Sequence, residues 1–125
     1  MLRPSDLNLD HAYELERLLK PLSNEPGFVG TTVVGYDGVV AFSDSQDHAE
    51  AIKLGLTGLR LFEHARDAIR GKVIFEVLEH LILGSSTQYL LITNFGSGLL
   101  IIVIDRTVGF QFERFLDLNW ANENL

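Results

Sequence analysis

The stretch Gly27–Asp44 constrains the fold of this chain more than any other part of the sequence. Two runs rich in β-branched and aromatic residues, Phe28–Tyr36 and Val39–Ser43, flank an Asp-Gly pair. Asp-Gly between such runs is a strong signal for a β-hairpin, because a type I′ turn needs positive φ at both central residues. Glycine adopts positive φ without a steric clash, and aspartate tolerates it better than most residues. We therefore predict a hairpin with its structural turn at Asp37 and Gly38.

Helical patterns lie on both sides of this hairpin. Leu7–Leu22 carries apolar residues at helical spacing, and Pro21 marks its end because the residue before a proline avoids the α region. After the hairpin, a helix is expected from Asp47 to Arg70, with a capping-box spacing at its start. Its apolar arc spans roughly 200°, about twice the stripe of roughly 100° that one core contact requires. Half of the arc can pack on a sheet, and the other half needs a second partner.

Small residues on this helix suggest what that partner is. Gly55 and Gly58 cost on the order of 1 kcal/mol each relative to alanine in a helix interior, a cost that a close backbone approach would explain. We expect a two-fold homodimer in which the helix packs on its own copy. The expected interface residues are Ala51, Gly55, Gly58, Leu59, Phe62 and Ala65. The alternative is a helix covered on both faces inside its own subunit, for which the rest of the chain is short.

Three further strands are expected after the long helix, at Glu76–Leu83, Gln88–Phe95 and Leu99–Asp105. The last one contains six consecutive apolar residues without alternation, so it should be a central strand covered on both faces. A short helix is expected from Thr107. The predicted order is helix, two strands, helix, three strands and a short helix, which describes a single α+β domain.

Composition narrows the class of protein. The 125 residues suit one domain, with its core at about residues 7–118, and a net charge of −7 argues against nucleic-acid partners and anionic membranes. The absence of cysteine excludes disulfides and thiolate metal sites. The N-terminal residues do not form a signal-peptide pattern, and the longest apolar run, Leu99–Ile104, is too short to span a bilayer. We expect a cytoplasmic protein without membrane insertion.

The sequence predicts no catalytic, cofactor-binding or metal-binding residues, and hence no enzyme. Gly30–Gly35 has the glycine spacing of a phosphate-binding loop, but Tyr36 and Asp37 stand where Lys and Ser/Thr are needed. The histidines lack the i, i+4 spacing of helical zinc pairs, and no serine lies in a nucleophile elbow. Four arginines could act on a phosphate of a partner protein: Arg60, Arg66, Arg70 and Arg106.

The order of elements resembles the Roadblock / dynein light chain family. The likeness lies in the hairpin Phe28–Ala41 and in the late pattern Tyr89–Phe95, Gly98 and Leu99–Ile104. The resemblance implies a five-stranded antiparallel sheet flanked by helices, with the last strand in the middle. It also implies dimerisation through the second helix and the third strand.

In function, the resemblance implies a non-catalytic scaffold or regulator of a small Ras-like GTPase or of a motor or signalling complex. Bacterial members often stimulate a small GTPase, whereas others anchor complexes, and the sequence does not separate these roles. The alternative of a different class is a small-molecule sensor of the PAS, GAF or profilin-like type, whose ligand would occupy a pocket between sheet and helix.

Overall fold

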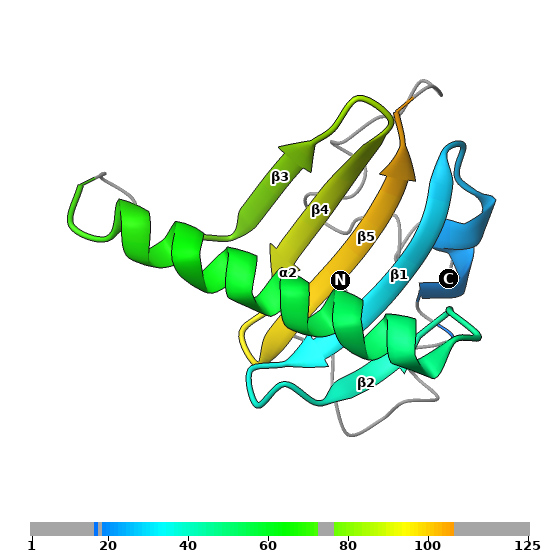
Figure 1. Ribbon diagram of the computed structural model, residues 1–125, viewed down its shortest axis with the longest axis horizontal. Helices are drawn as coiled ribbons and strands as arrows, with labels where there is room; N and C mark the ends of the chain where they lie inside the picture. The colour runs from blue at the N-terminus through cyan, green and yellow to red at the C-terminus, as the bar shows by residue number, and fades with distance from the viewer. Residues whose placement is uncertain (1–16, 18, 73–76, 107–125) are drawn as a thin grey trace.

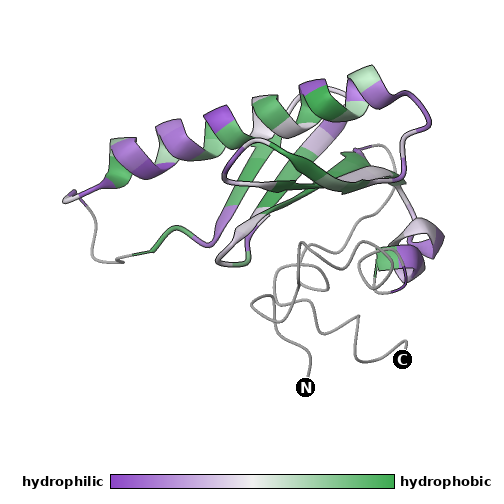
Figure 2. Cartoon of the chain, turned by 90° about the horizontal axis from the view of Figure 1, so that it is seen from below, coloured by the Kyte–Doolittle hydropathy of each residue, from purple (hydrophilic) through white to green (hydrophobic). Residues whose placement is uncertain are grey.

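A five-stranded antiparallel sheet is crossed on one face by a long helix (Figure 1). The structure is a computed structural model, and it describes residues 17, 19–72 and 77–106. In chain order the elements are the 3-10 helix η2 (Lys20–Asn24), β1 (Phe28–Gly35), β2 (Val40–Ser43), α2 (His48–Ile69), β3 (His80–Gly84), β4 (Gln88–Asn94) and β5 (Gly98–Asp105). Helix α2 covers one face of the sheet and η2 lies on the other (Figure 2).

The strand order β2-β1-β5-β4-β3 places the last strand in the middle of the sheet. Ile101 of β5 pairs with Thr32 of β1 on one side and with Ile92 of β4 on the other. Consecutive residues of β5 point to opposite faces, and both Leu100 and Ile101 are fully buried. The prediction of a central strand covered on both faces is therefore confirmed, as is the α+β class.

The hairpin between β1 and β2 forms as predicted, but its turn differs from the predicted type. Gly38 N donates to Gly35 O at 2.9 Å, and Gly35 N donates to Val39 O at 3.0 Å. These bonds define a three-residue loop that ends with Gly38 at φ 85°, not a two-residue type I′ turn centred on Asp37-Gly38. Such loops place one residue in the left-handed region. Asp37 contributes differently, since its Oδ1 accepts from Val39 N at 3.0 Å.

Helix α2 lies within the predicted bounds, Asp47 to Arg70, which are its two capping residues. The Asp47 side chain caps it by accepting from Ala49 N at 3.0 Å and from Glu50 N at 3.2 Å. Beyond its end, Gly71 has a φ of 71°, a conformation that favours glycine. Among the described residues, no helix is both long and apolar enough to cross a lipid bilayer.

Strand β3 begins later than predicted. It starts at His80, which pairs with Thr93 near the end of β4, and it continues to Gly84. The expected start at Glu76 lies outside the described residues, and residues 77–79 are not in the strand. The helix expected from Thr107 and most of the one expected at Leu7–Leu22 also lie outside the described residues.

Candidate protein-interaction surface

The side of α2 that carries its small residues packs on the sheet of the same chain. A Cβ added at Gly55 would lie 3.2 Å from Val40 Cγ2 and 3.4 Å from Val34 Cβ. A Cβ added at Gly58 would overlap Ile101 Cδ1 and lie 3.0 Å from Ile101 Cγ1. Both glycines therefore allow the helix backbone to approach β1, β2 and β5.

This packing assigns most of the expected interface residues to the interior of the protomer. Ala51 is 3%, Leu59 8% and Phe62 0% exposed, and Gly55 and Gly58 are also buried. Contacts with the sheet of the same chain therefore occupy these five positions, and the seam expected between two copies stays a prediction. Ala65, the sixth, is half-buried and keeps some surface.

A band of partly exposed apolar side chains lies beside this buried contact. Leu81 of β3 pairs with Ile92, whose side chain contacts the helix face at Gly58, so Leu81 also points to the helix side of the sheet. Leu83 and its partner Leu90, two residues further along their strands, point the same way. We define the apolar band as Leu61 and Ala65 of α2, Leu81 and Leu83 of β3, and Leu90 of β4. Leu61, Leu81 and Leu90 pack against the core while remaining incompletely covered.

Among the described residues, the band reaches an edge of the sheet at which no further strand pairs. The strand order ends at β3, whose sequence His80–Gly84 contains no acidic residue, lysine or proline. Edge strands are usually protected by such residues, because their unpaired peptide groups can accept another strand. Ile82 and Leu83 are 42% and 39% exposed, and the C-terminal half of α2 extends past this edge (Figure 1). An uncharged edge and an adjoining apolar band together form a candidate interface.

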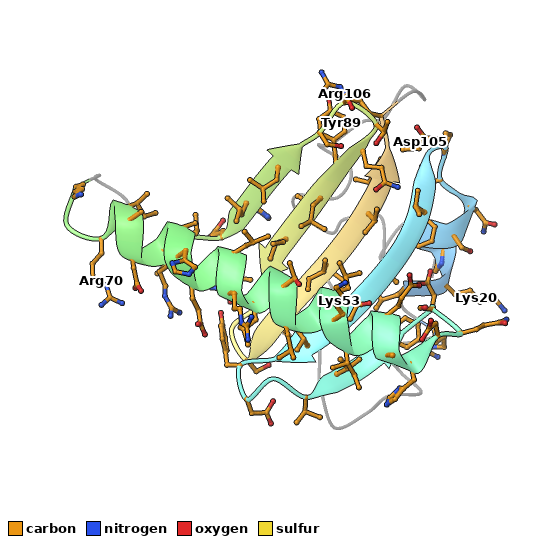
Figure 3. The ribbon with its side chains drawn as sticks, viewed as in Figure 1. Lys20, Lys53, Arg70, Tyr89, Asp105 and Arg106 are labelled. Carbon is orange, nitrogen blue, oxygen red and sulfur yellow. The ribbon has the colours of Figure 1, made fainter. Side chains whose placement is uncertain are left out.

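The four candidate arginines have different surroundings. Arg106 stacks over the Tyr89 ring at 5.2 Å, and its Nη1 donates to Ser85 O at 2.6 Å. The two side chains lie together at the top of the sheet in Figure 3. Arg70 lies 3.6 Å from Asp67 in an exposed pair, and Arg66 is half-buried. Arg60 is exposed on α2 and makes no ion pair with another described residue.

Tyr36 ties the end of β1 to the end of β4. Its hydroxyl donates to Asn94 Oδ1 at 2.7 Å. Burial raises the pKa of the Tyr36 phenol, while the nearby Arg66 guanidinium acts in the opposite direction. The contact joins the ends of β1 and β4 beside Arg66 of α2.

The described part of the chain contains no group of three His, Asp or Glu side chains that could hold a metal ion. Gly30–Gly35, the stretch with phosphate-loop spacing, is part of β1. Sequence reasoning missed the strand residues of the band, Leu81, Leu83 and Leu90. The signal available was the uncharged run at the end of the third predicted strand.

The sequence matches no protein-family model, and no curated protein sequence matches it. Solved structures do match. A Roadblock/LC7 domain from Streptomyces avermitilis has a TM-score of 0.74 at 14% identity, covering 86% of this chain and 92% of that chain. Myxococcus xanthus MglB has a TM-score of 0.65 at 14% identity, covering 94% of this chain and 86% of its own. A structure of MglB with a tetrameric arrangement has a TM-score of 0.67 at 16% identity, with the same coverage of 94% and 86%. The chain therefore has the fold of the roadblock domains, as the resemblance of its hairpin predicted.

Proposed function

We propose that this protein is a dimeric, non-catalytic regulatory scaffold that binds a small Ras-like GTPase. The observation that carries the proposal is the apolar band next to the uncharged β3 edge. A partly exposed apolar surface that continues onto an open sheet edge is suited to a protein partner. The roadblock fold supports the same role, and the proposal places the protein in the cytoplasm.

In the proposed dimer, β3 of one copy pairs with β3 of the other around a two-fold axis. Each copy then presents the same patch to its partner. The two sheets become one, and the two apolar bands come together under the C-terminal halves of the α2 helices. Leu83 would be covered in this arrangement, and burying the exposed part of such a side chain contributes on the order of 1 kcal/mol.

The GTPase partner would supply the nucleotide chemistry. The chain has neither the lysine nor the Ser/Thr of a phosphate-binding loop after Gly35. A regulator of this kind acts by reorganising the switch segments of the GTPase, with or without a donated arginine. If an arginine is donated to the GTPase, Arg60 is the candidate. In a second form of the proposal, the chain anchors the GTPase without stimulating its GTP hydrolysis.

The test uses the purified chain and a purified Ras-like GTPase from the same genome. We expect the chain to bind the GTPase in one nucleotide state, GDP or a non-hydrolysable GTP analogue, more tightly than in the other. Turnover measured with and without the chain distinguishes stimulation from anchoring. If Arg60 is donated, Arg60→Ala lowers the stimulated rate on the order of 10³-fold or more, whereas Arg70→Ala, the matched control, leaves it unchanged. Equal or absent binding in both nucleotide states would contradict the proposed role.

A further inference from the structure

An open cavity of about 520 Å³ lies between the N-terminal half of α2 and the sheet, away from the apolar band. Its walls come from four parts of the chain: the start of β1, the segment that joins β2 to α2, the first turns of α2, and Val103 of β5. Its polar lining includes Asp44, Glu50, Lys53 and Thr57, and its apolar lining includes Val29, Leu54 and Val103. This volume falls in the range of small-molecule sites, which combine apolar walls with a few polar groups.

One carboxylate of the cavity is held in place by the backbone. Asp44 Oδ1 accepts from Thr31 N at 3.0 Å. Gly30 leaves room beside this carboxylate, since a Cβ there would lie 3.3 Å from Asp44 Oδ1. The bond fixes the orientation of the carboxylate while leaving its second oxygen available to a ligand. A group that is fixed before binding loses less freedom when the ligand arrives.

The hydroxyls of the cavity floor are already satisfied within the protein. Thr32 Oγ1, on the helix side of the sheet, lies 3.1 Å from Ser43 Oγ. Ser45 Oγ donates to Asp47 O at 3.2 Å. These hydroxyls shape the cavity, and recognition of a ligand falls to the charged groups of its walls and to Thr57 of α2.

The charged groups of the cavity are of both signs. Lys53 lies on α2 where the helix passes over the sheet (Figure 3). Among the described residues, neither Lys53 nor Glu50 has a partner within ion-pair distance. The cavity thus offers a fixed carboxylate at Asp44, a second at Glu50 and an ammonium group at Lys53, around the apolar side chains of Val29, Leu54 and Val103.

We propose that this cavity binds a free amino acid with an apolar side chain. The α-ammonium group would be received by Asp44 and Glu50, the α-carboxylate by Lys53 and Thr57, and the side chain by the apolar lining. This chemistry needs a ligand with both charges close together and an apolar group beside them. The site is separate from the proposed GTPase regulation and does not depend on it.

Calorimetric titration and thermal melting with L-leucine and L-phenylalanine test the proposal. We expect a Kd on the order of 0.1–1 mM, because a free amino acid has few atoms to bury, and a melting point raised by a few degrees at about 10 mM ligand. Isopentylamine lacks the carboxylate and 4-methylpentanoate lacks the amine. Each should bind about tenfold more weakly or worse than leucine, because one charged hydrogen bond is lost.

Matched variants show whether binding occurs in this cavity. Asp44→Asn keeps an acceptor for Thr31 N but removes the charge, and Lys53→Met removes the ammonium group; each should weaken leucine binding about tenfold or more. Asp37→Asn changes another carboxylate that accepts a backbone N–H, that of Val39, and Lys72→Met changes another exposed lysine. Both controls should bind as wild type does. No heat and no melting shift with either amino acid would overturn the proposal, and so would binding that Asp44→Asn and Lys53→Met leave unchanged.

Discussion

Replacing Gly58 by alanine should destabilise the protomer, whereas the same change at Gly55 should not. The two positions lie on the same side of α2 but meet different neighbours. A Cβ at Gly58 would overlap Ile101 Cδ1, and Ile101 is fully buried between β1 and β4. A Cβ at Gly55 would lie 3.2 Å from Val40 Cγ2, on the edge strand β2, where a small shift relieves the contact.

Two opposing effects set the size of the change. Alanine is favoured over glycine in a helix interior by about 1 kcal/mol, and this gain applies at both positions. Overpacking a well-packed core costs about 1–3 kcal/mol, and only Gly58 carries that cost in full. We expect Gly58→Ala to lower the free energy of unfolding by about 1 kcal/mol and Gly55→Ala to raise it by up to about 1 kcal/mol.

Urea unfolding at equal protein concentration measures both changes. Ile101→Val removes the overlapping Cδ1, so Gly58→Ala should cost less in the Ile101→Val background than in wild type. Equal effects of the two alanine substitutions would refute the reasoning. So would a loss of dimer mass in Gly58→Ala with unchanged unfolding, because that result would place the glycine at an interface between chains.

Three further predictions concern the turn between β1 and β2, the cap of α2 and the Tyr36 phenol. Gly38→Val should lower the free energy of unfolding by about 1–3 kcal/mol, because a β-branched residue is strained at positive φ; an unchanged thermal midpoint would contradict the position of Gly38 in the turn. Asp47→Ala should cost about 1 kcal/mol in urea unfolding through the lost cap, and Asp47→Ser, which can still accept, should cost less. Burial raises the pKa of Tyr36 in the folded state above the unfolded-state pKa near 10. The stability that this shift contributes is present below the unfolded-state pKa and is lost as the pH rises through the folded-state pKa. Tyr36→Phe should therefore lose less stability than wild type between about pH 9 and 11, and equal losses would contradict the assignment.

The parts of the fold that could be predicted from sequence are those whose signal is local. Leu99–Ile104 has no polar residue at any position, so this run is expected to form a strand that is covered on both faces. Asp47 caps the start of α2 through its own neighbours Ala49 and Glu50, and Gly71 follows the end of the helix at positive φ. The signal for the position of the hairpin was equally local, but the length of its loop depends on how β2 pairs with β1. Ala41 is an extra residue in the pairing of β2 with β1, where Phe42 pairs with Val33 and Val40 with Val34.

The features that could not be predicted depend on residues far apart in the sequence. Gly55 and Gly58 signal a close approach, but a sheet and a second helix produce the same pattern of small residues. The start of β3 at His80 depends on where β4 ends. The cavity beside α2 requires Gly30 and Asp44 to meet across a hairpin, and the apolar band requires Leu61 to lie near two strands that follow it.

The mass of the protein in solution tests the proposed interface most directly. Wild type at tens of micromolar should scatter light as a particle of twice 14.0 kDa. Leu83→Glu should reduce the mass to that of one chain, because it places a charge in the apolar band at the β3 edge. Ile52→Glu is the matched control, since Ile52 is as exposed as Leu83, at 39%, but lies on α2 outside the band, and it should remain a dimer. A monomeric wild type would contradict the proposed dimer, and so would a dimer that Leu83→Glu leaves intact.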